Sequence, residues 1–172
     1  TGKAAKPALT SSVTVAYAYE DPLRQSLLRY KFQGRSYYAG AYGAMLGMQI
    51  LREHLEFDVI TWVPVSRKRR RKRGYDQAEL LATARELGRR AEPLLEKFRD
   101  IPPQSGIQDA ARRRANVLGV YRMRPGAAVQ GKRVLLIDDI LTTGATLGEA
   151  ARVLMEAGAG EVQVAVLAAA RK

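Results

Sequence analysis

Two adjacent carboxylates, Asp138 and Asp139, stand between an apolar run and a turn that carries several hydroxyl groups. The apolar run, residues 134–137, is typical of a buried parallel strand, because helices cover both faces of such a strand. The turn, residues 142–144, leads into an amphipathic helix that we expect to begin near Thr146. Ligands of open α/β sheets bind beyond the carboxyl ends of strands, and the N–H groups at a helix N-terminus attract anions. The segment therefore predicts a site for a phosphorylated sugar.

A plainer interpretation of the same segment is that one Asp caps the next helix, while Thr and Gly are ordinary turn residues. Capping needs only one acid or one Thr, however, and the segment holds two acids and three threonines. We therefore prefer the binding interpretation.

The stretch Val134–Thr146 resembles, at all thirteen positions, the phosphoribosyl pyrophosphate (PRPP) signature of the type I phosphoribosyltransferases. The resemblance implies that Asp138 and Asp139 are catalytic: they would accept hydrogen bonds from the ribose 2- and 3-hydroxyls and stabilise positive charge on the ring. It also implies a Mg²⁺ cofactor held mainly by the ligand, without direct protein ligands. The loop for the 5-phosphate would consist of Thr142, Thr143, Gly144, Ala145 and Thr146.

A second block narrows the resemblance to the competence-associated ComF branch of these transferases. It runs from Val63-Pro64-Val65-Ser66 through a basic stretch, residues 67–73, to Gly74-Tyr75-Asp76-Gln77. The resemblance implies a pyrophosphate loop made of Ser66, Arg67 and Arg73. Three positions depart from the usual pattern, with Ser66 for Pro, Tyr75 for Phe and Asp76 for Asn. We interpret Asp76 as the cap of the following helix rather than as a partner that orients Arg73.

A third block, from Arg99 to Asn116-Val117, is similar to the next element of that family. It implies a mobile loop in which Arg99, Gln104 and Arg113 close over the reacting bond. Ile101 stands where the family typically has Thr. Many relatives begin with a cysteine-rich zinc module, and this sequence contains no cysteine.

The net charge of +12 indicates attraction to polyanions. Seven basic residues form one run, residues 67–73, which we expect to be a loop. A solvated loop is one interpretation of this run. The alternatives are contacts to nucleotide phosphates or salt-dependent binding of nucleic acid through Arg69, Arg70, Arg71 and Lys72. No helix-turn-helix, zinc-finger or aromatic stacking motif that could read bases is evident.

Strands and helices alternate along the 172 residues, which predicts an α/β fold with a parallel or mixed sheet. The resemblance makes this the type I phosphoribosyltransferase fold, with a central, mostly parallel, twisted sheet, flanking helices and a small N-terminal hood. We expect a flexible leader over 1–12, the hood over 13–57 and the transferase core over 58–172. Predicted strands cover 13–19, 58–65, 94–98, 117–123 and 161–169, besides the strand at 134–137. Predicted helices cover 36–55, 75–91 and 109–116, besides those that begin near Asp21 and Thr146.

Three classes of function remain open. The first is an active phosphoribosyltransferase of unknown acceptor, related to DNA uptake in natural competence. The second is a PRPP sensor without turnover. The third is a basic accessory factor of DNA uptake that binds single-stranded DNA or competence proteins. We expect a cytoplasmic protein without a membrane span, and a homodimer by analogy with type I relatives. The single histidine, His54, is interpreted as a surface residue rather than a catalytic base.

Overall fold

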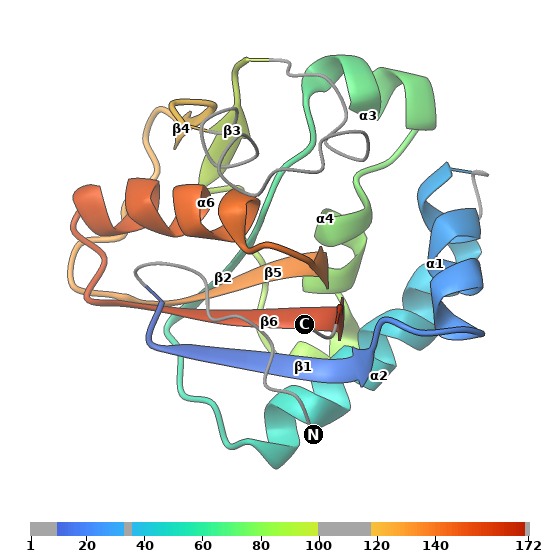
Figure 1. Ribbon diagram of the computed structural model, residues 1–172. Coiled ribbons are helices and arrows are strands. Elements are labelled where there is room, and N and C mark those ends of the chain that lie inside the picture. The colour runs from blue at the N-terminus through green and yellow to red at the C-terminus, as the bar shows by residue number, and fades with distance from the viewer. Residues whose placement is uncertain (1–9, 33–35, 100–117, 171–172) are drawn as a thin grey trace.

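A sheet of four parallel strands, in the order β1-β6-β5-β2, forms the centre of the molecule (Figure 1). The computed structural model describes residues 10–32, 36–99 and 118–170. The strands are β1 (Ser12–Ala18), β2 (Val59–Trp62), β5 (Arg133–Leu141) and β6 (Glu161–Ala169). β5 and β6 are central, and almost every residue of both is buried or half-buried. This agrees with their continuous apolar sequences, since a parallel sheet is covered on both faces.

Helices from the first half of the chain cover one face of the sheet. They are α1 (Leu23–Phe32), η1 (Ser36–Tyr38), α2 (Ala39–Arg52) and α4 (Gln77–Ala82). Their buried side chains form one apolar cluster with Ile60, Leu135 and Ile137 of the sheet. This cluster holds the N-terminal helices against the strands that lead to the acidic pair.

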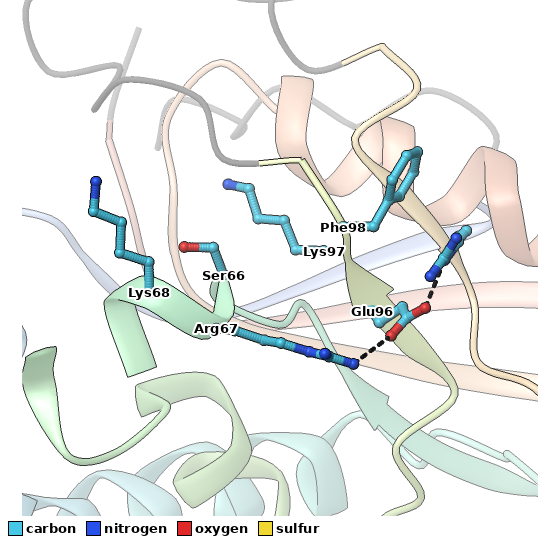
Figure 2. A pocket seen from close by; sticks show the side chains of 7 residues that line it. Ser66, Arg67, Lys68, Glu96, Lys97 and Phe98 are labelled. Carbon is cyan, nitrogen blue, oxygen red and sulfur yellow. Dashed lines mark hydrogen bonds and ion pairs between the residues drawn. The ribbon is translucent and has the colours of Figure 1, made fainter. Parts of the chain in front are cut away.

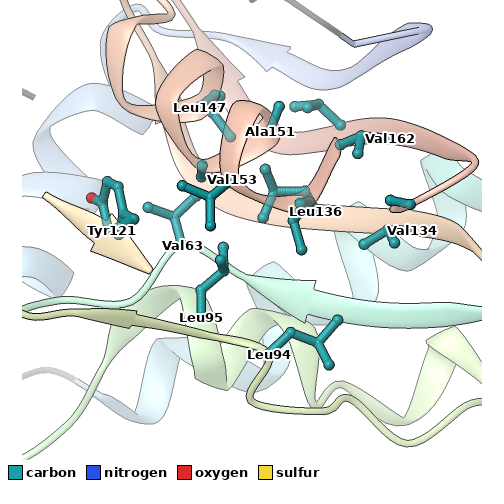
Figure 3. Close-up of a cluster of buried hydrophobic side chains, with 14 of the residues drawn as sticks. Val63, Leu94, Leu95, Tyr121, Val134, Leu136, Leu147, Ala151, Val153 and Val162 are labelled. Carbon is teal, nitrogen blue, oxygen red and sulfur yellow. The ribbon is translucent and has the colours of Figure 1, made fainter. Parts of the chain in front are cut away.

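The other face carries the helix α6 (Ala145–Glu156) and a small antiparallel hairpin of β3 (Leu95–Lys97) and β4 (Tyr121–Met123). Figure 3 shows the second apolar cluster, in which Leu147 and Ala151 of α6 meet Leu136 of β5 and Leu95 of β3. α6 is therefore fixed directly above the strand that precedes it, so its N-terminus lies close to the end of β5.

Glycines allow α2 to approach the chain after α4. A Cβ atom added to Gly43 would lie 2.5 Å from the Cβ of Ala84, and one added to Gly47 would lie 2.6 Å from that of Glu86. A Cβ atom on Gly40 would meet nothing within 4 Å. Close packing thus accounts for Gly43 and Gly47 but not for Gly40.

The structure corrects three expectations for individual elements. Residues 67–73, predicted as a loop, form the helix α3 (Arg67–Arg73). The helix predicted over 75–91 is interrupted, because Ala84 is extended and only the short η2 (Arg85–Leu87) follows α4. β5 does not end at the acidic pair but continues through it to Leu141. The helix predicted over 109–116 lies outside the described residues.

The N-terminal region contributes one strand to the main sheet. β1 begins at Ser12, inside the range expected for the leader, and pairs along β6 from Ser12↔Gln163 to Ala18↔Ala169. His54 lies beyond the end of α2 and is exposed, as expected. In the part of the chain that the structure describes, none of the helices has the length and apolar content that crossing a bilayer requires.

Candidate functional site

The acidic pair lies on a part of β5 that extends past its neighbour β2. The pairing of β2 with β5 stops at Trp62↔Ile137, and Val63 N–H donates one more hydrogen bond to the Ile137 carbonyl at 3.0 Å. On the other side, β5 remains paired with β6 as far as Leu141↔Ala169. Residues 138–141 therefore project at the carboxyl edge of the sheet, where open α/β folds bind ligands.

Each carboxylate of the pair is oriented by the next backbone amide. Asp139 N–H donates to Asp138 Oδ1 at 2.8 Å, and Ile140 N–H donates to Asp139 Oδ1 at 2.8 Å. Asp138 is half-buried, whereas Asp139 is 3% exposed. These local bonds hold both acids in place at the end of an otherwise apolar strand.

The two carboxylates lie toward opposite faces of the sheet. Burial raises the pKa of Tyr121 on β4, and the negative charge of Asp138 adds to this shift. Burial likewise raises the pKa of Tyr30 on α1, with the charge of Asp139 as the second cause. Asp138 thus lies toward the face of α6 and the hairpin, and Asp139 toward the face of the N-terminal helices.

The segment 142–146 follows the end of β5, two residues after the acidic pair, and leads into α6 at Ala145. Gly144 has a φ of 79°, a conformation that favours glycine, and its carbonyl accepts the first bond of the helix from Gly148 N–H at 2.8 Å. Thr143 Oγ1 accepts a hydrogen bond from Ala145 N–H at 3.4 Å. Thr142 is exposed, and Thr143 and Thr146 are half-buried. The structure therefore combines hydroxyl groups and helix N-terminal amides a few residues from Asp138 and Asp139.

The connection after β2 is organised by two caps. Ser66 is 3% exposed, and its Oγ accepts from Arg69 N–H at 3.3 Å, which caps α3. Asp76 accepts from Ala78 N–H at 3.1 Å and Glu79 N–H at 3.4 Å, which caps α4 as the sequence predicts. Its other oxygen accepts from Val65 N–H at 2.9 Å, so one carboxylate closes the whole turn. Burial raises the pKa of Asp76, against the effect of these bonds.

α3 has two different faces. Arg67 is 85% exposed at its side chain and pairs with Glu96 at 3.6 Å, and Arg70 pairs with Glu79 at 2.9 Å. Arg69 and Arg73, one helical turn apart, are half-buried instead. Burial lowers the pKa of the Arg73 guanidinium, the positive charge of Arg69 lowers it further, and Asp139 acts in the opposite direction.

The structure therefore brings Arg73 near the acidic pair and separates it from Arg67, although the sequence assigns both to the pyrophosphate loop. Arg73 Nη1 donates to Gln77 Oε1 at 2.9 Å, and Tyr30 Oη donates to the Gln77 carbonyl at 2.9 Å. Gln77 and Tyr30 thus support the site, although the sequence analysis gives neither of them a role in it. The i, i+4 spacing of Arg73 and Gln77 is the signal that predicts their contact.

The residues expected on the mobile loop are described only in part. Arg99 is exposed, with its guanidinium 5.4 Å from the centroid of the Phe98 ring. Gln104 and Arg113 lie outside the described residues. Of the basic residues expected to bind nucleic acid, Arg70, Arg71 and Lys72 are exposed and Arg69 is half-buried.

Glu149 is a further residue that the sequence analysis does not single out. It is 4% exposed, and its Oε1 accepts from Gly119 N–H at 2.8 Å and from Arg152 Nη2 at 2.8 Å. Burial disfavours its charge, but these bonds outweigh that effect and lower the pKa of Glu149. Glu149 thereby ties the chain just before β4 to α6.

The family comparison agrees with this geometry. Residues 54–172 match the family model described as the phosphoribosyl transferase domain. The match includes α3, β5, the acidic pair and the segment that begins α6. The fold class predicted from the sequence, the type I phosphoribosyltransferase fold, is confirmed.

Curated relatives specify the branch. A protein of Escherichia coli O157:H7 named DNA utilization protein YhgH is 31% identical over 160 residues, which cover 88% of this chain and 69% of that protein. Competence protein ComFC of Bacillus subtilis (strain 168) is 31% identical over 143 residues, which cover 83% of this chain and 57% of that protein. The chain belongs to the phosphoribosyltransferase domain family and, within it, to the ComF branch.

Among solved structures, one titled as the allosteric regulatory enzyme of purine biosynthesis is similar to this chain. The TM-score is 0.49 at 27% sequence identity, and the similarity covers 74% of this chain and 25% of that one.

Proposed function

We propose that this chain binds PRPP together with Mg²⁺ at the projecting end of β5 and transfers its phosphoribosyl group to an acceptor. The main support for the proposal is that the acidic pair near the end of β5 is followed, two residues later, by the segment 142–146 at the N-terminus of α6. The ribose 2- and 3-hydroxyls would donate to Asp138 and Asp139. The 5-phosphate would be held by the hydroxyls and backbone amides of residues 142–146.

Arg73, near Asp139, is the residue that we assign to the pyrophosphate. Arg is suited to phosphate because its planar guanidinium makes paired, charge-assisted hydrogen bonds. Gln77 would keep this guanidinium in position through the bond to Arg73 Nη1. During transfer, the bond from the ribose anomeric carbon to pyrophosphate breaks and a bond to the acceptor forms. The carboxylates would stabilise the positive charge that develops on the ring.

The donor set fits Mg²⁺ carried by the ligand. Among the described residues, there is no group of three or more His, Cys, Asp and Glu side chains that could hold a metal ion by itself. Mg²⁺ commonly binds through one or two carboxylates together with the phosphates of a substrate. Because Asp138 and Asp139 are assigned to the ribose hydroxyls, PRPP itself would supply most of the ligands of the ion, which would neutralise charge on the pyrophosphate when bound.

The proposal is tested by calorimetric titration with PRPP, with and without Mg²⁺. We expect Mg²⁺-dependent binding in the micromolar range and a loss of at least a hundredfold in the double variant Asp138→Asn, Asp139→Asn. The matched control is the double variant Glu20→Gln, Asp21→Asn, which removes the same two charges from adjacent acids that, unlike Asp138 and Asp139, are both exposed. If wild-type protein fails to bind under either condition, the proposal is wrong.

Turnover is tested separately, by pyrophosphate release in the presence of candidate acceptors. Binding without release for any acceptor would favour a PRPP sensor. We also propose a role in the handling of DNA during uptake, which the names DNA utilization protein and competence protein of the relatives support, and a cytoplasmic location. A strain that carries only the Asp138→Asn, Asp139→Asn form should then transform less often than its parent. A homodimer is part of the proposal, and light scattering of the purified chain tests it.

A further inference from the structure

A basic cavity lies beside the hairpin, apart from the acidic pair and the segment 142–146. It has a volume of about 240 Å³ and is lined by residues from α3, β3 and β4 and from the positions next to them (Figure 2). The lining residues are Ser66, Arg67, Lys68, Glu96, Lys97, Phe98 and Arg122. Four of them are cations and one is an acid, so the cavity attracts anions. Its volume lies just below the roughly 300–1,000 Å³ of small-molecule sites, which suits one ring with a charged substituent.

The cavity also contains an exposed aromatic ring, that of Phe98, which contacts two guanidinium groups, those of Arg122 and Arg99. Phe98 is 44% exposed. The guanidinium carbon of Arg122 lies 4.9 Å from the centroid of its ring, and Arg122 Nε donates to Glu96 Oε1 at 2.5 Å. Glu96 also pairs with Arg67. Because Glu96 and Arg122 are register partners in the hairpin, the Arg122 guanidinium lies next to Phe98, two residues after Glu96.

Two lysines complete the cavity on the side away from the ring. In Figure 2, Lys68 of α3 and Lys97 of β3 extend in the same general direction, and Phe98 lies on the other side. Lys97 Nζ is 5.6 Å from the centroid of the Tyr121 ring. The arrangement thus offers a flat, apolar and cationic surface for a ring, next to flexible ammonium groups for an anion.

We propose that this cavity binds a nucleotide unit, with the base stacked on Phe98 and Arg122 and a phosphate held by Lys68 and Lys97. Bases stack on aromatic rings and on arginine planes, and this contact tolerates any base because each has a π-face. The nucleotide unit is either a free mononucleotide or one unit of a single strand. Ser66 and Arg67 of the lining belong to the predicted pyrophosphate loop, but the four residues given a role here, Phe98, Arg122, Lys68 and Lys97, have none in the proposed function. The variants below therefore separate the two proposals.

The test compares ligands that carry the same phosphates with and without bases. We would measure binding of the 172-residue chain to an oligothymidylate, to an abasic oligomer of equal length and to a thymidine mononucleotide. The variant Phe98→Leu keeps an apolar side chain and removes the ring. Its matched control is Tyr17→Leu, because Tyr17 on β1 is another exposed aromatic residue, 46% exposed.

We expect Phe98→Leu to weaken oligothymidylate binding about tenfold and to leave abasic binding unchanged, in line with the cost of losing one stacked base. Tyr17→Leu should leave both unchanged. Equal binding of the mononucleotide and the oligomer by the wild type would identify a free nucleotide as ligand, and preference for the oligomer would identify a strand. If Phe98→Leu weakened the binding of oligothymidylate and of the abasic oligomer equally, or weakened neither, the proposal would be overturned.

A second test compares two lysines of the same helix, α3. Lys68 lines the cavity, and Lys72, one turn further along α3, does not. Lys68→Gln should therefore weaken mononucleotide binding at least threefold, whereas Lys72→Gln should leave it unchanged. The Asp138→Asn, Asp139→Asn variant should retain base-dependent binding, and Phe98→Leu should retain PRPP binding. These two results separate failure of this inference from failure of the proposed function.

Discussion

Neighbouring arginines of α3 have different surroundings, although they belong to one uninterrupted basic run. Arg67 faces solvent and Glu96, whereas Arg69 and Arg73 are half-buried, and Arg73 is near Asp139. Half-burial leaves fewer waters to compete for the guanidinium, so a bound phosphate gains more from Arg73 than from Arg67. Which arginine binds the phosphate most strongly therefore depends on the face of α3 on which it lies, and not on its position in the basic run.

We predict that Arg73→Gln and Arg69→Gln each lower the affinity for PRPP by roughly tenfold or more, the range expected for a lost charged hydrogen bond. Arg67→Gln should change it by less than about threefold, because an exposed ion pair contributes little. Calorimetric titration at fixed Mg²⁺ measures all three. A larger loss for Arg67→Gln than for Arg69→Gln would return the pyrophosphate site to the outer face of α3.

A second prediction concerns Asp58 at the start of β2. Arg133 N–H donates to Asp58 Oδ2 at 2.8 Å, and Arg133 Nη2 lies 3.0 Å from Oδ1. Hydrogen bonds from the Arg133 side chain and backbone lower the pKa of Asp58 to about 2. Its contribution to stability is thus fully present above the unfolded pKa near 4, and it is lost as pH falls toward 2.

Asp58→Asn should therefore be less stable than wild type at pH 6, and the difference should shrink between pH 4 and pH 2. Urea unfolding at a series of pH values measures this. A difference that stays constant across that range would show that the Asp58–Arg133 contact does not depend on the charge of Asp58.

At the scale of elements, α2 offers a matched pair of glycine substitutions. In Gly43→Ala the new methyl would lie 2.5 Å from Ala84 Cβ, so either α2 or the chain after α4 must move. We expect a loss of about 1–3 kcal/mol in the free energy of unfolding, the usual range for overpacking. In Gly40→Ala nothing lies within 4 Å, and the higher helix propensity of alanine should add about 0.5–1 kcal/mol.

Thermal or urea unfolding of the two variants beside wild type measures the difference. Opposite signs are expected. If both substitutions stabilise the protein, α2 packs less tightly against Ala84 than the structure indicates.

The sequence correctly predicts those elements whose signals lie within the element itself. The strand–acid–turn–helix order of 134–146 appears in the structure because burial on both faces, a glycine with positive φ and a helix start are all local signals. α3 had local signals as well: Ser66 and Gly74 stand where an N-cap and a C-cap belong, and Arg and Lys favour helices. The dense positive charge of residues 67–73 instead favours a solvated loop, which is why the sequence analysis predicts one.

What the sequence does not predict depends on register between distant segments. Arg122 reaches Glu96 and Phe98 only because β4 pairs with β3 in one particular register. Gly119 reaches Glu149 only because α6 lies over the hairpin. For the same reason, the sequence around Phe98, which follows β3, gives no local sign of an aromatic stacking surface.

At the scale of the whole molecule, the charge of +12 should make polyanion binding depend on salt. The slope of log affinity against log salt for a single strand is about −0.7 for each phosphate neutralised. Lys68→Gln should therefore make the slope shallower by about 0.7. Lys132→Gln should leave it unchanged, since Lys132 precedes β5, at the opposite end of the strand from the acidic pair.

Anisotropy titrations with oligothymidylate between 50 and 300 mM salt, a range chosen around physiological ionic strength, measure both slopes. Equal effects of the two substitutions would mean that the strand is attracted by net charge alone and contacts no particular surface.

The order of the strands also has a consequence for the time at which the protein can fold. β1 pairs only with β6 in the described sheet, and these partners are separated by about 150 residues in the chain. On the ribosome, β1 is synthesised long before its neighbour β6. Until residues 161–169 have left the exit tunnel, β1 has no partner in the described sheet, and the helices of the first half lack part of the apolar surface that they cover. A nascent chain of this protein is thus a candidate client for chaperones during that interval.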